Sequence, residues 1–130
     1  MPRSARRPVD IDHLNRYTGG DHAINEEVLR LFETSCTNIV AELERLAESS
    51  KLPQPAPEPA PESAKAWAHA THTLKGAARS VGAFELADVA EEAEKCGPAD
   101  RLAAIAAIQK LKGQAEMVHR FIADFLRAPA

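Results

Sequence analysis

Aromatic residues are scarce in this sequence, where Phe, Trp and Tyr make up 5% of 130 residues. β-Sheets depend on aromatic and β-branched side chains, whereas this chain is rich in alanine, leucine, glutamate and arginine, which favour helices. Hydrophobic residues account for 45% of the chain, enough for the core of one domain of this length. We therefore expect a single all-α domain.

Cysteines are few, and long hydrophobic runs are missing. Cys36 and Cys96 lie far apart and form no CxxC pair, which favours reduced thiols and a cytoplasmic location. No stretch approaches the roughly 20 apolar residues that span a bilayer. The basic start PRSARRP lacks the apolar run of an export signal. We expect no membrane association and a flexible basic tail over residues 1–8.

Positive charge is in slight deficit, with 16 Lys and Arg against 19 Asp and Glu and a net charge of −3 at pH 7. This balance argues against nucleic-acid binding over a broad surface, which requires many phosphates to be neutralised. A Walker glycine loop for nucleotide binding is also missing. We therefore expect no ATP-dependent kinase activity of the chain's own.

Apolar residues at helical spacing divide the chain into five expected helices. These cover residues 10–17, a long segment from about residue 22 that Asp21 caps, residues 62–81, residues 84–95, and a last segment with Pro98 in its first turn. The expected inward-facing residues include Ile11, Leu14 and Tyr17; Ile24, Val28, Leu31, Phe32, Ser35, Ile39, Leu43 and Leu46; Leu86, Val89, Ala90 and Ala93; and Leu102, Ile105, Ile108, Leu111, Ala115, Val118, Phe121, Ile122 and Phe125. Four long helices with mostly short loops predict an antiparallel four-helix bundle over residues 9–127, with the short N-terminal helix covering one end.

Proline occupies every second position from Pro53 to Pro61. This pattern forbids a helix and favours extended polyproline II conformation. We expect a semi-rigid loop over about residues 50–61 between two helices of the bundle. A ligand for proline-binding adaptor domains is less favoured, because a defined PxxP motif with a basic flank is missing.

Acidic residues are absent from Ser63 to Phe84, although the whole chain has 19. His72 lies two residues before Leu74, an expected core position, so it points about 200° away from Leu74 and toward solvent. Trp67, Ala70, Ala77, Ala78 and Val81 complete the apolar stripe, and Lys65, Lys75, Gly76 and Arg79 share or border the face of His72. The sequence thus predicts a local cationic strip around an exposed imidazole.

An exposed imidazole is largely neutral at pH 7, and its ring nitrogen is then a competent nucleophile. Neighbouring cations favour the neutral ring and would stabilise an anion on it, such as a phosphoryl group. Gly76 costs about 1 kcal/mol relative to alanine inside a helix. We interpret it as leaving space for another protein to approach His72 closely enough for in-line transfer.

The segment HTLKG at residues 72–76, followed by Gly82, resembles the signature of histidine-containing phosphotransfer (HPt) domains. In that signature H-x-L-K-G precedes a second glycine ten residues after the histidine. The segments TGGD…EEVLRLF and GAFELADVAEEAEK resemble the flanking helices of the family, so the resemblance covers most of residues 9–127. It implies that His72 accepts a phosphoryl group from the aspartate of one response-regulator receiver domain and passes it to another. It also implies that Lys75 holds the phosphoryl oxygens and that Gly76 permits docking.

The resemblance implies receiver domains and a hybrid histidine kinase as partners, and it places a Mg²⁺ ion on the receiver. We therefore expect no cofactor or metal of the chain's own. From helix geometry we add Arg79, Lys65 and His69 as binding residues around the site. The pair His69 and His72 lacks the carboxylate or cysteine that would complete a zinc site.

Three alternatives stay open for His72. The first is an ordinary solvated histidine, against which the lysine, glycine and acid-free context argue. The second is a noncatalytic four-helix adaptor, against which the joint presence of His72, Lys75 and Gly76 argues. The third is the phosphoacceptor segment of a sensor kinase, which usually has an H-E/D-x-x-x-P box, whereas Thr73 follows His72. That segment requires a dimer, and we expect a monomer.

Overall fold

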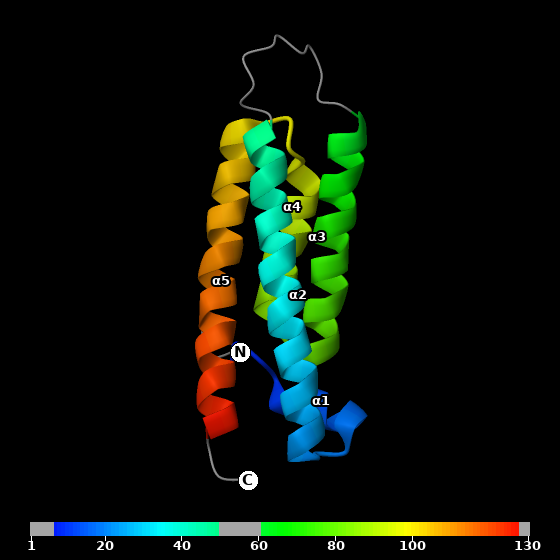
Figure 1. The fold of residues 1–130 in the computed structure, drawn as a ribbon, viewed down its shortest axis with the longest axis vertical. Coiled ribbons are helices and arrows are strands. Elements are labelled where there is room, and N and C mark those ends of the chain that lie inside the picture. Colours follow the sequence, from blue (N-terminus) through cyan, green and yellow to red (C-terminus); the bar gives the residue numbers. More distant parts are fainter. Residues whose placement is uncertain (1–6, 50–60, 128–130) are drawn as a thin grey trace.

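The computed structural model describes residues 7–49 and 61–127, and this part of the chain consists of helices and the turns that join them, with no strand, as Figure 1 shows. Its elements are α1 (Ile11–Thr18), α2 (His22–Ser49), α3 (Pro61–Val81), α4 (Phe84–Cys96) and α5 (Arg101–Arg127). The prediction of an all-α fold is confirmed. The expected loop at residues 50–60 and most of the expected basic tail lie outside the described residues, and Pro61 belongs to α3 rather than to the loop.

The four long helices surround one core. Helices α2 and α4 each pack against both α3 and α5, so the α3–α4 seam lies across the bundle from the α2–α5 seam. All four run along the long axis in Figure 1, and α1 packs against α2 and α3 at one end. The largest fully buried side chains are Trp67, Leu14, Leu29, Leu43, Leu74, Leu86, Leu111 and Ile122. No helix of the described part is long and apolar enough to cross a membrane.

The predicted N-caps at the start of the chain are confirmed. The Asp10 carboxylate accepts from the backbone N–H of His13 at 3.1 Å, and the Asp21 carboxylate accepts from that of Ile24 at 3.1 Å. Each bond satisfies one backbone donor that a helix N-terminus leaves without an intrahelical partner. Gly19 ends α1 in the left-handed conformation, at φ 71°.

Gly82 joins the N-terminal segment to the turn between α3 and α4. Its φ is +89°, and its carbonyl oxygen accepts from the backbone N–H of Asp10 at 2.9 Å. A Cβ atom at Gly82 would lie 2.6 Å from the carbonyl oxygen of Asp10. Only glycine fits both this backbone conformation and this close approach, so Gly82 fixes the end of α3, the helix that carries His72.

The predicted start of α5 is wrong. Pro98 lies before the helix, not in its first turn, and α5 begins at Arg101. The Asp100 carboxylate accepts from the backbone N–H of Ala103 at 3.1 Å. Aspartate is a stronger N-cap than Gly97, which would cap a helix that began at Pro98. The chain leaves α4 through Gly97 at φ 67° and ψ 171°, a backbone conformation that favours glycine.

Several apolar residues that were expected to face inward are exposed instead. The exposed fraction is 74% for Tyr17, 45% for Ile24, 63% for Leu31 and 82% for Leu102, and Ser35 is exposed too. In α2 the buried face carries Asn25, Leu29, Phe32, Cys36, Val40 and Leu43. The first buried position is therefore a polar residue, and its side chain amide donates to Asn15 at 2.9 Å.

Candidate functional site

His72 lies on the exposed side of α3, at the seam with α4. The side chain is 69% exposed, and its Nδ1 atom lies 3.6 Å from the Glu94 Oε2 atom of α4. The seam below it is fixed by Trp67, whose indole N–H donates to the carbonyl oxygen of Ala93 at 2.8 Å. Thr71, next to His72, is buried, and its hydroxyl donates to the Trp67 carbonyl oxygen at 2.9 Å. The predicted outward orientation of His72 is confirmed.

Lys75 reaches across the seam to two carboxylates of α4. Its Nζ atom donates to Glu94 Oε1 at 2.9 Å and lies 4.0 Å from Glu91 Oε1. Arg79, one turn further, places its Nη2 atom 3.5 Å from the same Glu91 oxygen. The hydrogen bond from Lys75 lowers the pKa of Glu94 although partial burial raises it, and the charges of Lys75 and His72 add to the lowering. We name Lys75, Arg79, Glu91 and Glu94 the seam cluster.

The prediction of a cationic strip around His72 is therefore wrong, because two carboxylates lie against its cations. Helix α3 carries no acidic residue after Glu62 in its first turn, but α4 places Glu91 and Glu94 against Lys75 and Arg79. The two carboxylates, three residues apart and thus on one side of α4, offset the two cations. Sequence reasoning missed them because a contact between residues 75 and 94 depends on how two helices pack. The only available signal was their i, i+3 spacing on the helix expected to neighbour the site.

Gly76 and Gly82 differ in their surroundings. Gly76 is exposed inside α3, and a Cβ atom built there would meet nothing within 4 Å. Nothing in the molecule itself requires glycine at this position, in contrast to Gly82. The helix face beside His72 is therefore flat at Gly76, as the interpretation of close approach by a partner requires.

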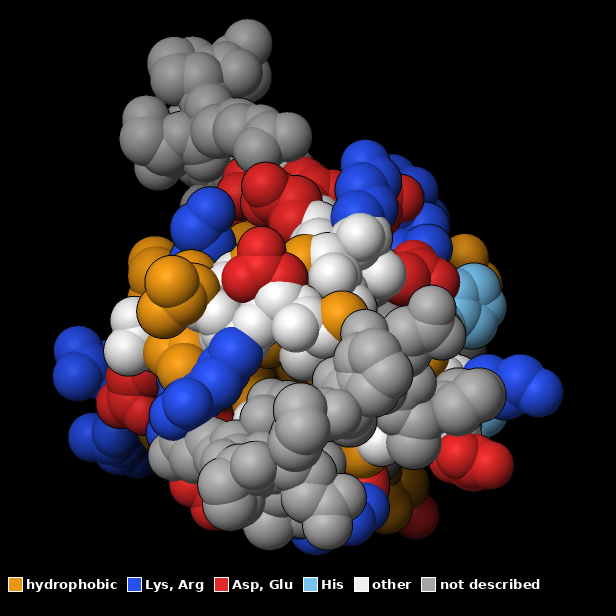
Figure 2. Space-filling view, turned by 90° about the horizontal axis from the view of Figure 1, so that it is seen from above, with side chains coloured by type: hydrophobic (Ala, Val, Ile, Leu, Met, Phe, Trp, Pro, Cys, Tyr) orange, Lys and Arg blue, Asp and Glu red, His pale blue; other side chains and the backbone are white. Residues whose placement is uncertain are grey.

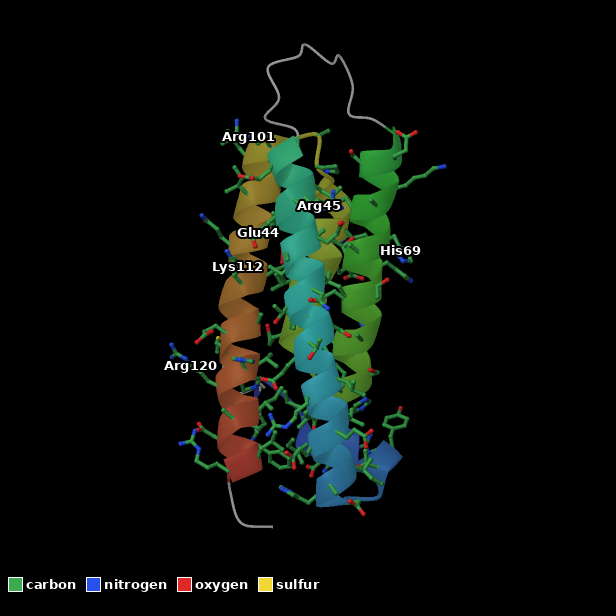
Figure 3. The ribbon with its side chains drawn as sticks, in the orientation of Figure 1. Glu44, Arg45, His69, Arg101, Lys112 and Arg120 are labelled. Atoms are coloured by element: carbon green, nitrogen blue, oxygen red, sulfur yellow. The ribbon has the colours of Figure 1, made fainter. Side chains whose placement is uncertain are left out.

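His69 and Lys65 lie outside the seam cluster. Both are exposed on α3, and Figure 3 shows His69 pointing away from the bundle. In Figure 2, which looks down the bundle, histidine side chains at the rim lie next to side chains of both charge signs. The structure thus brings His72, Lys75 and Arg79 together at one seam, and leaves His69 and Lys65 beside it on the open surface.

Within the described ranges, no group of three or more His, Cys, Asp and Glu side chains is arranged to hold a metal ion. Cys36 and Cys96 are free, the first buried and the second half-buried.

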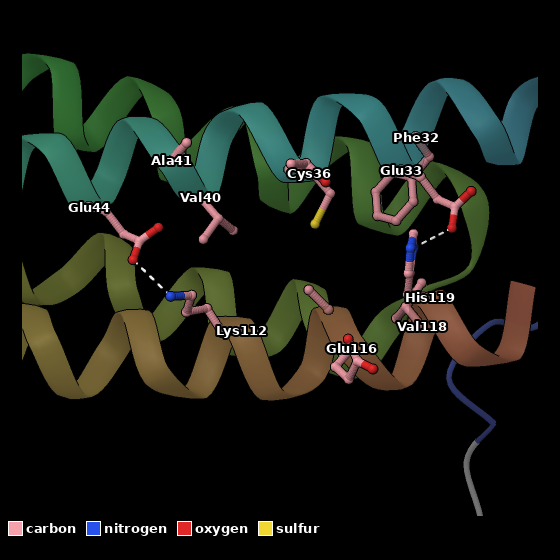
Figure 4. A pocket seen from close by; sticks show the side chains of 12 residues that line it. Phe32, Glu33, Cys36, Val40, Ala41, Glu44, Lys112, Glu116, Val118 and His119 are labelled. Atoms are coloured by element: carbon pink, nitrogen blue, oxygen red, sulfur yellow. Dashed lines mark hydrogen bonds and ion pairs between the residues drawn. The ribbon is translucent and has the colours of Figure 1, made fainter.

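A second feature occupies the opposite seam. A cavity of about 390 Å³ opens between α2 and α5, with Phe32, Cys36 and Val40 among its lining residues. Two ion pairs cross it in Figure 4, one between Glu33 and His119 and one between Glu44 and Lys112. It shares no lining residue with the surroundings of His72.

Comparison with protein-family models decides the family. The model of the Hpt domain matches residues 27–123, three quarters of the chain. The chain belongs to the Hpt domain family. The match includes α3, α4 and the seam cluster and leaves out α1, so it is narrower than the predicted extent of residues 9–127. Hpt domains serve phosphotransfer in two-component signalling and interact with receiver domains. No curated protein and no solved structure matches this Hpt domain.

Proposed function

We propose that this Hpt domain is a phosphorelay intermediate. His72 takes a phosphoryl group from the aspartyl phosphate of one receiver domain and passes it to the aspartate of another. The observation that carries the proposal is the exposed imidazole of His72 beside Glu94, with Lys75 bound to the same carboxylate and the flat helix face at Gly76 one turn along α3. The family match supports the same chemistry.

The position of Glu94 selects the reactive nitrogen. Its carboxylate faces Nδ1 of His72 at 3.6 Å, which favours the tautomer that carries the proton on Nδ1. Nε2 then keeps its lone pair. In the transfer, Nε2 attacks phosphorus, an N–P bond forms, and the bond from phosphorus to the aspartate oxygen breaks as the carboxylate leaves with its electron pair. The Nδ1 proton stays on the ring.

Lys75 and Arg79 supply the positive charge for the phosphoryl oxygens. Lys75 lies one turn after His72 and is 15% exposed, so its ammonium group stays near the seam. Such a point charge stabilises the anion that develops during transfer. Arg79 lies one turn further and extends the same side. We propose Lys65 and His69 as contacts to the docked receiver at the edge of this face.

The proposal includes the architecture and setting of the domain. The chain in Figure 1 passes along α2, α3, α4 and α5 in alternating directions, which supports an antiparallel four-helix bundle with α1 at one end. We propose that the domain acts as a monomer in the cytoplasm, with a hybrid histidine kinase among its partners. It would contribute no ATP chemistry or metal of its own, and Mg²⁺ would bind to the receiver.

The test uses a phosphorylated receiver domain with Mg²⁺ as donor and a second receiver as final acceptor. The wild-type chain should transfer the phosphoryl group between them, and His72→Gln should transfer none while keeping its helix content, because position 72 is exposed. His119→Gln, at the opposite seam, is the matched control and should behave as wild type. His69→Gln should still accept the group, at a reduced rate. Binding of receivers without any transfer would indicate the noncatalytic adaptor instead.

A further inference from the structure

The formal charges of the seam cluster next to His72 sum to zero before any phosphoryl group arrives. Lys75 and Arg79 contribute two positive charges, and Glu91 and Glu94 contribute two negative ones. Each cation has a carboxylate within 4 Å, Lys75 with Glu94 at 2.9 Å and Arg79 with Glu91 at 3.5 Å. The site that receives an anion is therefore not prepared with an excess of positive charge.

Phosphoryl transfer to His72 makes this balance negative. The attacking imidazole is the neutral form, because nucleophilic attack needs a free nitrogen lone pair, and the phosphoryl group brings a charge of about −1.5 to −2 at pH 7. The ring offsets at most one unit through its Nδ1 proton. The phosphoryl group would be bonded to Nε2, across the ring from Nδ1, and it is Nδ1 that lies 3.6 Å from the Glu94 Oε2 atom. A carboxylate so near the ring repels the net negative charge of the phosphorylated side chain and disfavours that form.

Glu94 and an incoming phosphoryl group would both interact with Lys75. Its ammonium group has three N–H donors, and Glu94 accepts from one of them, so a phosphoryl group would share the positive charge of Lys75 with this carboxylate. This pair is less exposed than an ordinary surface ion pair, because the side chain of Lys75 is 15% exposed and that of Glu94 is 28% exposed. Solvent therefore screens it less than it screens an open surface pair.

We infer that Glu91 and Glu94 set the phosphoryl-transfer equilibrium of this site, making His72 a carrier that retains the group weakly and passes it on. They do so by competing with the phosphoryl group for Lys75 and Arg79. When the group leaves, the N–P bond at Nε2 breaks and an O–P bond forms on the aspartate of the next receiver. The inference rests on the proposed function and concerns the regulation of the same site.

The first experiment measures how the phosphoryl group divides at equilibrium between a receiver domain and the chain. Glu94→Gln removes the charge but keeps an oxygen that can accept from Nδ1 of His72, and Glu91→Gln removes the second carboxylate. Each should raise the equilibrium constant for retention on His72 by about three- to tenfold. Glu92→Gln is the control, because Glu92 is exposed on the same helix outside the seam cluster and should leave the constant unchanged. A retention constant for Glu94→Gln that equals the wild-type value, or falls below it, overturns the inference.

The second experiment separates this inference from the proposed function. The chain is phosphorylated chemically with phosphoramidate and equilibrated with free imidazole, which accepts the group without protein docking. The same rise of about three- to tenfold is expected for Glu94→Gln, with His72→Gln as the blank. If the wild-type chain exchanges with imidazole but not with receivers, the proposed function fails while the effect of the carboxylates is still measured. Equal constants for wild type and Glu94→Gln in imidazole overturn the inference alone.

Discussion

At the scale of single residues, two glycines near His72 have different surroundings. At Gly82 the molecule itself demands glycine, through a φ of +89° and a backbone oxygen 2.6 Å from the place of a Cβ atom. At Gly76 the surroundings are open. The first glycine is therefore required by the fold, whereas nothing within the described structure requires the second, for which we propose a role in receiver docking.

Replacing Gly82 tests the folding role. Gly82→Ala should lower the free energy of unfolding by about 2–3 kcal/mol, because alanine is strained at this φ and its Cβ would clash with Asp10. Gly76→Ala is the matched comparison and should raise it by about 0.5–1 kcal/mol, since alanine is the better helix former. Chemical denaturation followed by the fluorescence of Trp67, the single tryptophan, measures both. Equal stability of Gly82→Ala and wild type would contradict the role assigned to this turn.

Replacing Gly76 by a large residue tests the docking role. Gly113 offers an unusually close control, because it too lies exposed inside a helix with nothing within 4 Å of an added Cβ. Gly76→Leu and Gly113→Leu should both stabilise their helices by about 0.5–1 kcal/mol. Only Gly76→Leu should reduce receiver binding, by about tenfold or more, when titrations of a receiver domain are compared. Unchanged affinity in Gly76→Leu would refute the explanation of Gly76 by close approach.

His72, Lys75 and Gly76 could be placed from the sequence because their arrangement is local. All three lie within five consecutive residues of one helix, so helical geometry alone determines their common face. Glu91 and Glu94 could not be found in this way. Their role depends on the packing of α4 against α3, and no property of a single helix encodes it.

At the scale of elements, the seam between α3 and α4 combines a buried hydrogen bond with the ion pairs of the seam cluster. Trp67 anchors α3 to the carbonyl of Ala93, and Glu94 follows directly in the chain. The indole hydrogen bond thus places the carboxylate that faces Lys75 and His72. The buried contact between Trp67 and Ala93 thus supports the position of Glu94 beside His72.

The ion pair of this seam gives stability a defined pH dependence. The hydrogen bond and charge of Lys75 hold the pKa of Glu94 below its ordinary value. A carboxyl whose pKa is lower in the folded state contributes stability above its unfolded pKa, and the contribution is lost as pH falls through the folded pKa. The difference in unfolding free energy between wild type and Glu94→Gln should therefore be largest near neutral pH and disappear in acid. Denaturation across this pH range measures it, with Glu92→Gln as control, and a difference that grows toward acid would contradict it.

The helix boundaries and phases show where apolar spacing misleads. At the start of α2 the buried position belongs to Asn25, which accepts from the Thr18 hydroxyl at 2.5 Å and is 2% exposed. Asn25 can be buried because residues of α1 hydrogen-bond to its side chain, and hydrophobic periodicity cannot recognise such a position. The apolar spacing predicts Ile24 as the inward-facing residue instead. At α5, the Asp100 cap follows the proline that was expected to begin the helix.

At the scale of the whole molecule, the bundle has two seams of different character. The α3–α4 seam holds the exposed His72, whereas the α2–α5 seam contains a cavity of about 390 Å³ lined in part by Cys36. Burial raises the pKa of the Cys36 thiol to about 11, and the nearby Glu33 carboxylate adds to the rise. The thiol is therefore protonated at neutral pH. Cys36 is 5% exposed in the folded domain.

Alkylation of the cysteines reports how firmly this second seam is closed. With iodoacetamide at neutral pH, Cys96 should react before Cys36, because the thiolate is the reactive form and Cys36 is the more buried of the two. Low denaturant concentrations should accelerate the modification of Cys36 by opening the α2–α5 seam. Mass analysis of peptides separates the two sites. Faster reaction at Cys36 than at Cys96 would show that the seam is open in the native domain.

The central claim is that His72 carries the phosphoryl group. The most direct measurement is the intact mass of wild type and His72→Gln after incubation with a phosphorylated receiver domain and Mg²⁺, without acid, because phosphohistidine is acid-labile. Wild type should gain the mass of one phosphoryl group, and His72→Gln should gain none. The same gain in His72→Gln, or no gain in wild type with several receivers, would contradict the account.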